Sequence, residues 1–341
     1  MRSDRPMTMA WAWLLLVSLA CLLGAIRAEA QEPAKVRFVT AWGDKGDGPG
    51  QFYSPVGLAL NDRDEVFVTD LNNARVQKFD SAGKHLATWD LPRDVPERRQ
   101  SLAGGIVCLG EGLVCLTFMQ QDKVRIYTEA GELVREWGKM GKAPGELNGP
   151  GGVVLGADQT LYVADQRNHR IQQFSREGQW LAGWGQHGLA PGEFDGKEPA
   201  GSRFGGPHYL ARDTQGRIYS TEGAHARVQQ FSPEGKSLAA WTKPGDDPGG
   251  FGAYKFGNLP NTFGPIGIAV DRFDRVYVSS LNDRVQVYTP AGTLLFTVGT
   301  GGDEPGEFRH PHALAFDRAG CLYVADSGNQ RIQKFEIPAP P

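Results

Sequence analysis

Two histidines in this chain have neighbours that suit metal binding or hydrogen bonding to a ligand. His208 and His312 each follow a proline and each precede an acidic residue by 14 positions, Glu222 and Asp326 respectively, and His310 lies close to the second histidine. A carboxylate that orients an imidazole commonly accompanies a metal-binding histidine. The pattern predicts a divalent-metal site with His208 and His312 as ligands and Glu222, Asp326 and His310 beside them. The alternative is that both histidines hydrogen-bond water at a solvated surface.

The elements that position these residues belong to a repeat. A short apolar strand ending in an acidic or polar residue, a turn, and Arg-Val/Ile-Gln-x-Phe or a close variant occur six times. The copies are 66–70 with 75–79, 114–118 with 123–127, 161–165 with 170–174, 218–222 with 227–231, 276–280 with 284–288, and 322–326 with 331–335. Corresponding residues are 46 to 58 positions apart. Self-similarity at this period, built from short strands, is typical of a β-propeller.

Each repeat is expected to form a four-stranded blade, so the predicted fold is an all-β, six-bladed propeller. In the third repeat the strands are 152–155, 161–164, 170–174 and 180–184, separated by turn residues. The predicted blades cover about 44–90, 91–138, 139–185, 186–242, 243–299 and 300–337. The last repeat lacks a fourth strand, whereas 36–43 resembles one. The N-terminal strand is therefore predicted to complete the last blade and close the ring.

The two histidines occupy one position of this repeat. The residue 14 positions before the end of the second strand reads Val56, Gly104, Gly151, His208, Ile266 and His312 through the six repeats. This position begins the innermost strand, beside the central channel. The histidines fall in alternate blades, so both are expected to point into one mouth of the channel.

The repeat motifs resemble those of the NHL family. The segments 48–52 (Gly-Pro-Gly-Gln-Phe), 55–59 (Pro-x-Gly-Leu-Ala) and 70–79 (Asp-x-x-Asn-x-Arg-Val-Gln-x-Phe) carry the resemblance, which extends over almost all of the chain after residue 35. The resemblance implies a six-bladed propeller whose functional surface bears the loops between blades and the loops between second and third strands. It implies no single activity.

The Pro-His-x-Leu-Ala motif around His208 and His312 also resembles a motif of peptidyl-α-hydroxyglycine α-amidating lyases. That likeness implies zinc, or another divalent metal, held in the channel by histidines from alternate blades. The match is partial, because Gly104 stands where a third histidine belongs, and catalytic zinc normally has three protein ligands.

Two segments that enter the fourth and fifth blades, 188–207 and 243–265, are about ten residues longer than their counterparts. The second contains aromatic and amide residues among glycines, a composition that suits a binding rim. The predicted rim consists of Phe251, Tyr254, Phe256, Asn258, Asn261 and Phe263. The alternative is that these aromatic residues pack beneath their own loop.

The N-terminal residues predict export. A basic start, an apolar run over 9–26 and Ala28-Glu29-Ala30 are typical of a signal peptide cleaved after residue 30, leaving 31–341 as one propeller domain. The expected location is the periplasm or the cell exterior, with no stable membrane insertion after cleavage. A retained membrane anchor is the alternative. The formal net charge of −3 gives no general attraction to nucleic acid.

Cys108 and Cys115 flank a tight turn around Glu111 and Gly112. If that turn has two residues, the cysteines lie opposite each other, and the sequence leaves both a disulfide and two free thiols open.

Together these features predict an exported, monomeric binding scaffold whose protein, peptide or glycan ligand contacts the loop-bearing face. The alternative function is a metal-dependent lyase or hydrolase that uses the channel histidines.

Overall fold

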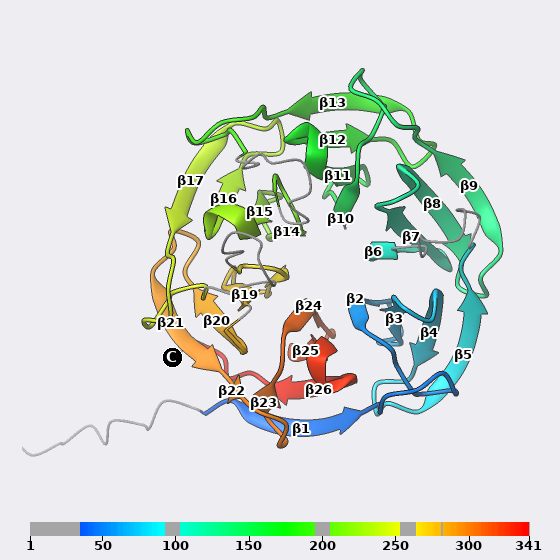
Figure 1. The fold of residues 1–341 in the computed structure, drawn as a ribbon, viewed down its shortest axis with the longest axis vertical. Helices are drawn as coiled ribbons and strands as arrows, with labels where there is room; N and C mark the ends of the chain where they lie inside the picture. Colours follow the sequence, from blue (N-terminus) through cyan, green and yellow to red (C-terminus); the bar gives the residue numbers. More distant parts are fainter. Residues whose placement is uncertain (1–34, 93–102, 195–204, 253–263, 281, 341) are drawn as a thin grey trace, which may run out of the picture. The chain divides into compact units, whose positions relative to one another are not determined.

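The computed structural model describes residues 35–92, 103–194, 205–252, 264–280 and 282–340, so the predicted export signal lies outside the described residues. Residues 36–337 form one compact unit. Six four-stranded antiparallel sheets form a ring in this unit, as Figure 1 shows, and their innermost strands line a central channel. The predicted all-β, six-bladed propeller is confirmed.

The strand bounds are close to those expected. Blade 1 contains β2 (Pro55–Leu60), β3 (Val66–Asp70), β4 (Arg75–Phe79) and β5 (His85–Asp90); blade 2 contains β6 (Ala103–Gly110), β7 (Leu113–Phe118), β8 (Lys123–Thr128) and β9 (Leu133–Trp137). Blade 3 contains β10 (Pro150–Leu155), β11 (Leu161–Asp165), β12 (Arg170–Phe174) and β13 (Trp180–Trp184); blade 4 contains β14 (Leu210–Arg212), β15 (Ile218–Glu222), β16 (Arg227–Phe231) and β17 (Ser237–Thr242). Blade 5 contains β18 (Ile268–Val270), β19 (Val276–Ser280), β20 (Arg284–Tyr288) and β21 (Leu294–Val298); blade 6 contains β24 (Pro311–Phe316), β25 (Cys321–Asp326), β26 (Arg331–Glu336) and β1 (Arg37–Trp42). A short parallel pair, β22 (Thr300–Gly301) and β23 (Glu307–Phe308), joins blades 5 and 6, and 3₁₀ turns follow β11, β15 and β25 at Gln166–Asn168, Gly223–His225 and Ser327–Asn329.

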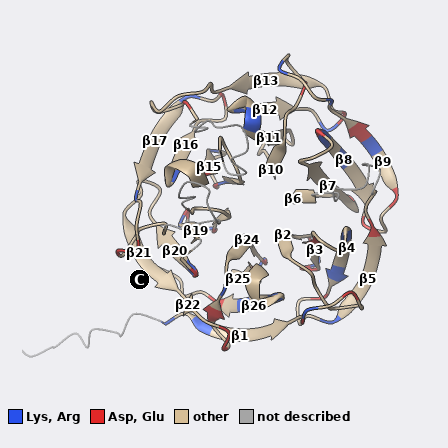
Figure 2. Cartoon of the chain, viewed as in Figure 1, with Lys and Arg blue, Asp and Glu red and all other residues tan. Residues whose placement is uncertain are grey.

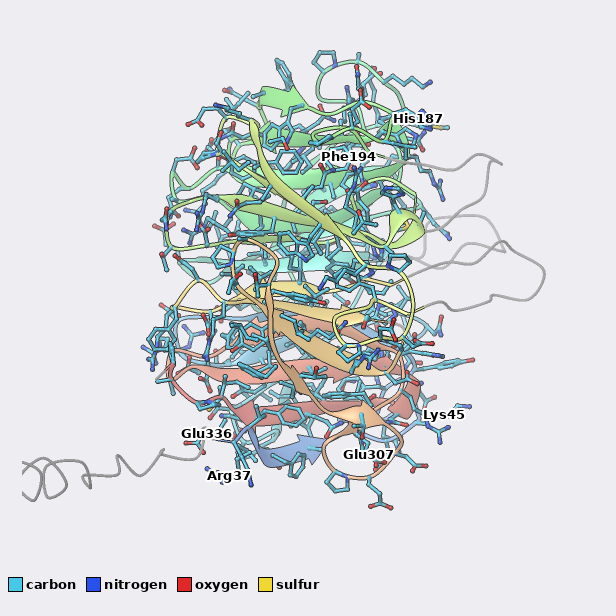
Figure 3. The ribbon with its side chains drawn as sticks, turned by 90° about the vertical axis from the view of Figure 1, so that its left-hand side faces the viewer. Arg37, Lys45, His187, Phe194, Glu307 and Glu336 are labelled. Carbon is cyan, nitrogen blue, oxygen red and sulfur yellow. The ribbon has the colours of Figure 1, made fainter. Side chains whose placement is uncertain are left out.

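The N-terminal strand closes the ring. β1 pairs antiparallel with β26, from Arg37 opposite Glu336 to Trp42 opposite Ile332. Arg37 and Glu336 also form an ion pair, and the two side chains lie together in Figure 3. Closure gives β26 a neighbour on its outer side, where an open array would leave a free sheet edge. The predicted completion of the last blade by the N-terminal strand is correct.

The two faces of the propeller differ in their connections. We call the face that carries the connections between blades, together with the turns between second and third strands, the upper face, and the opposite one the lower face. In Figure 3 the labelled Lys45 and His187, from connections between blades, lie at the right-hand edge, and Arg37 and Glu336 lie at the left-hand edge.

Tryptophans on the outer strands lock consecutive blades together. The indole rings of Trp42, Trp89, Trp137, Trp184 and Trp241 pack against a glycine in the next blade's turn between third and fourth strands, respectively Gly83, Gly131, Gly178, Gly235 and Gly292. Each of these glycines also has a positive φ. The contact needs a residue without a side chain, because any Cβ would meet the indole ring.

Gly235→Ala is expected to destabilise the propeller by about 3–5 kcal/mol, since the new methyl group overlaps the Trp184 ring and the backbone has φ +86°. Gly216→Ala is a matched control. Gly216 has φ +81°, but the nearest atom to its added Cβ is 3.6 Å away, at Pro233. It should cost only about 1–2 kcal/mol, from backbone strain alone. Urea unfolding of both variants measures the difference, and equal losses would rule out the indole contact as the cause.

Cys108 and Cys115 are both free thiols, because the hairpin that carries them is irregular. Gly110 pairs with Leu113 across the expected two-residue turn, but a register shift between Cys108 and Gly110 places Cys108 opposite Val114 and Cys115 opposite Val107. The two side chains enter different apolar clusters, Cys108 between blades 1 and 2 and Cys115 between blades 2 and 3. In the described part of the chain, no helix has the length and apolar character needed to cross a membrane.

Candidate functional site

The upper end of the channel is formed by the first residues of the innermost strands. The backbones of the two histidines are fixed there between neighbouring blades. The His208 N–H donates to Thr221 O (2.8 Å), and its carbonyl accepts from the Gly152 N–H (2.6 Å). The His312 carbonyl accepts from Ser279 Oγ (2.5 Å). Hydrogen bonds across blade boundaries therefore hold both residues at the channel.

Both imidazoles are neutral at ordinary pH. Burial, and then the nearby His312, lower the pKa of His208 to about 3. Burial, and then His310, lower the pKa of His312 to about 4. Nδ1 of His312 is buried and has no hydrogen-bond partner among the described residues. The structure thus brings His208 near His312, and His312 near His310.

Tyr209 separates the histidines from the rest of the channel. Its ring packs edge-on against His208 at a centroid distance of 4.8 Å. Its hydroxyl reaches across the channel and is within hydrogen-bond distance of Val56 O (3.1 Å) and Gly104 O (3.4 Å), in blades 1 and 2. Burial raises the pKa of this phenol well above its usual range, so it remains a proton donor. Tyr209 therefore packs beside His208 and extends across the channel to blades 1 and 2.

The sequence alone indicates that Tyr209 is unusual, although the metal-site pattern does not include it. The corresponding position of the six repeats reads Gly57, Gly105, Gly152, Tyr209, Gly267 and Ala313. An added Cβ at these glycines would collide with a neighbouring blade; at Gly105, for example, it would lie 2.6 Å from Gly151 O. The position favours glycine or alanine in five blades. The single tyrosine is the clearest departure from the repeat.

Glu222 and Asp326, the carboxylates expected beside the imidazoles, each accept hydrogen bonds from an arginine and a glutamine of the third strand. Glu222 accepts hydrogen bonds from Arg227 Nε and Nη2 and from Gln229 Nε2, each at 2.8 Å. Asp326 accepts from Arg331 Nε (2.7 Å) and from three other donors, Asn329, Gln333 and the Arg309 N–H. Most of these bonds join the second strand of the blade to the third, and the one from the Arg309 N–H joins Asp326 to the connection into blade 6, the structural role that the repeated Asp and Arg residues suggest.

The described residues do not supply a complete zinc site. No group of three or more His, Cys, Asp or Glu side chains in the described ranges could hold a metal ion. His208 and His312 offer two neutral imidazoles, whereas zinc sites normally require three or four protein ligands. The donor set therefore does not fit a catalytic zinc ion.

Phe251 is not a rim residue, and this prediction was wrong. Its side chain is fully buried and packs on Tyr288 at a centroid distance of 5.8 Å. It occupies the position that Phe52, Phe194 and Phe308 hold in other blades, where the phenyl ring fills the core below the inter-blade connection. The other predicted rim residues, Tyr254, Phe256, Asn258, Asn261 and Phe263, lie outside the described residues.

The comparisons with known proteins agree with this architecture. Residues 52–79, 147–174 and 308–335 match the family model of the NHL repeat. Each matched segment spans the first three strands of a blade, so three of the six blades match this repeat.

Two curated relatives align with part of the chain. NHL repeat-containing protein 3 of Mus musculus is 27% identical over 113 residues, which are 32% of this chain and 31% of that protein. Peptidyl-glycine alpha-amidating monooxygenase of Mus musculus is 30% identical over 143 residues, 38% of this chain and 14% of that protein. The chain thus spans less than a third of the length of either relative.

Solved structures share the fold at low sequence identity. Virginiamycin B lyase from Staphylococcus aureus superimposes with a TM-score of 0.58 and 14% identity, over 89% of this chain and 100% of that one. A Xanthomonas campestris gluconolactonase gives 0.58 and 16%, over 90% and 96% of the two chains. A Bacteroides thetaiotaomicron protein of unknown function gives 0.65 and 16%, over 88% and 76%. At this identity the likeness shows the propeller fold alone.

Proposed function

We propose that this protein is a binding scaffold whose protein, peptide or glycan ligand docks on the upper face and contacts the channel mouth. One observation carries the proposal: several departures from the six-fold repeat meet at the upper end of the channel. His208, Tyr209 and His312 replace small or apolar residues of the repeat. Repeated residues maintain the ring, whereas residues that break the repeat on one face are candidates for recognition.

The chemistry of the mouth suits hydrogen bonding to a polar ligand. A neutral imidazole has one N–H donor and one acceptor nitrogen. Two such rings and the aromatic ring of Tyr209 provide polar groups for orientation and an apolar surface for packing, the usual composition of a ligand pocket. Nδ1 of His312, buried and lacking a partner among the described residues, is the atom with the most to gain from a ligand.

The lengths of two connections also support a ligand on this face. Phe52 and Phe308 precede the proline of the next innermost strand by three positions, but Phe194 and Phe251 precede it by 13 and 14. Both longer segments follow a phenylalanine that is buried in the core. Long segments on a rigid scaffold are commonly recognition elements.

We also propose that the protein acts after export, as a monomer, in the periplasm or outside the cell, and that it binds no nucleic acid. The N-terminal sequence pattern and the formal net charge of −3 support these two points. A metal-dependent lyase or hydrolase remains the second candidate, on the likeness of the channel histidines to those of amidating lyases. The described residues give it only two of the three ligands it needs.

Removal of residues 253–263 is expected to abolish ligand binding and leave the propeller folded. The deletion leaves Gly252 and Gly264 between Phe251 and Pro265, which restores the spacing of blade 1 and retains the buried Phe251. Glycan and peptide arrays probed with wild type, the deletion and Leu238→Ser would test this. Leu238 is 46% exposed on the outer strand β17 and serves as the control. Ligands retained by a folded deletion variant would contradict a role for this segment.

A further inference from the structure

The channel contains a second compartment on the other side of Tyr209. A cavity of about 400 Å³ opens between the later residues of the six innermost strands. Tyr209 contributes to its wall, but His208 and His312 do not. The cavity is therefore distinct from the upper mouth and lies toward the lower face. Its volume is within the range of roughly 300–1,000 Å³ that small-molecule sites occupy.

The outer part of this cavity is apolar except at one position. One repeat position lies four residues after the position that holds His208 and His312. The residue at this position lines the cavity in every blade and is half-buried each time. These residues are Leu60, Cys108, Leu155, Arg212, Val270 and Phe316. Burial keeps the Cys108 thiol protonated by raising its pKa well above the usual range. Five neutral side chains and one guanidinium therefore surround the opening.

Arg212 is also the single charged residue on the innermost strands β2, β6, β10, β14, β18 and β24. Figure 2 shows β2, β6, β10 and β24 without blue or red segments, while the charges lie farther out on the blades. A partly buried guanidinium on these otherwise uncharged strands is expected to have an anionic partner, because burying a charge is costly unless it is paired.

No carboxylate of the described residues pairs with Arg212. Its Nε donates to Leu155 O (3.0 Å), and its Nη1 is 3.4 Å from Asp213 O. The neighbouring Asp213 carboxylate is already occupied: Oδ1 accepts the N–H groups of Gln215 and Arg217, and Oδ2 accepts from Arg217 Nε and the Tyr219 hydroxyl. The guanidinium therefore retains hydrogen-bonding capacity toward an anion at the cavity.

We propose that the lower channel cavity binds a small monocarboxylic acid with an apolar body, with the carboxylate on Arg212 and the hydrocarbon part against Leu60, Leu155, Val270 and Phe316. Guanidinium–carboxylate hydrogen bonds are charge-assisted and about twice as strong as neutral ones. This site is independent of the function proposed for the upper face.

Calorimetric titration with hexanoate and with hexanamide tests the proposal. Wild type should bind hexanoate at least tenfold more tightly than hexanamide, because only the acid carries the charge. Arg212→Met should weaken hexanoate binding at least tenfold, and Arg212→Lys should restore most of it. Arg272→Met, on the exposed turn after β18 and outside the cavity lining, should leave binding unchanged.

Several outcomes would overturn the proposal. One is the absence of hexanoate binding by wild type. The other is equal binding of the acid and the amide, or equal binding by wild type and by a folded Arg212→Met variant. The His208→Gln/His312→Gln variant should bind hexanoate normally. A loss in that variant would place the acid at the upper mouth instead and would likewise overturn the proposal.

Discussion

Acidification from about pH 6.5 to about pH 4 is expected to lower the free energy of unfolding by roughly 1.4 kcal/mol per pH unit for each of His208 and His312. Their pKa values are about 3 and about 4 in the folded protein, whereas a histidine in the unfolded chain titrates near 6.5. Within this window the unfolded state binds protons that the folded state does not. The contribution of the two neutral histidines to stability is complete above the pKa of histidine in the unfolded chain. It is lost as the pH falls toward their pKa values in the folded protein.

Urea unfolding between pH 4 and pH 7, with a chelator present, measures this slope. The His208→Gln/His312→Gln variant should lose most of it, while His85→Gln, on the outer strand β5, should keep it. The same steep slope in wild type and in the double variant would show that other groups cause the pH dependence. NMR titration of the two imidazoles gives a direct check, because both should remain neutral at pH 5.5.

Loss of a buried carboxylate from the repeat should be among the most damaging single changes to the ring. Asp326→Ala is expected to cost about 3–5 kcal/mol of stability, because it leaves a partly buried guanidinium and three other donors without their acceptor. Arg331 also holds the carbonyl groups of Asp303, Glu304 and Glu307, so the connection into blade 6 should loosen as well. Asp303→Ala, in the same connection but with its side chain 73% exposed, should cost less than about 0.5 kcal/mol.

Blade 5 offers the reverse experiment. Ser280 stands where blades 1, 3 and 6 have aspartate, and it pairs with Arg284 in the same register. Nε of Arg284 is buried and has no hydrogen-bond partner among the described residues. Ser280→Asp is therefore expected to raise stability by about 1 kcal/mol. Destabilisation by this substitution would show that the shorter turn of blade 5 has changed the geometry of the pair.

The repeat made the fold predictable, because strand spacing, turn residues and the unmatched strand at each end all follow from the chain itself. The error at Phe251 arose from the long glycine-rich segment after it. That segment concealed Pro248-Gly249-Gly250-Phe251 as a further copy of the motif that reads Gly-Pro-Gly-Gln-Phe at 48–52. Alignment of this motif would have placed Phe251 in the core.

The site was only partly predictable. The position of His208 and His312 at one channel mouth followed from counting along the repeat. The hydrogen bonds from arginine and glutamine to Glu222 and Asp326 did not, because adjacency across a hairpin does not determine every neighbour that a carboxylate contacts. In each case an arginine and a glutamine of the next strand hold the carboxylate. Tyr209 could have been identified from the sequence, because the other repeats have glycine or alanine at the corresponding position. Its contacts with blades 1 and 2 could not, because they depend on the curvature of the closed ring.

The central claim, that a ligand contacts the histidines above Tyr209, is tested most directly on glycan and peptide arrays probed with wild type and with His208→Gln/His312→Gln. The account predicts at least one glycan or peptide that wild type binds and that the folded double variant binds at least tenfold more weakly. Equal binding by the two proteins, or no bound member for wild type on either array, would contradict it.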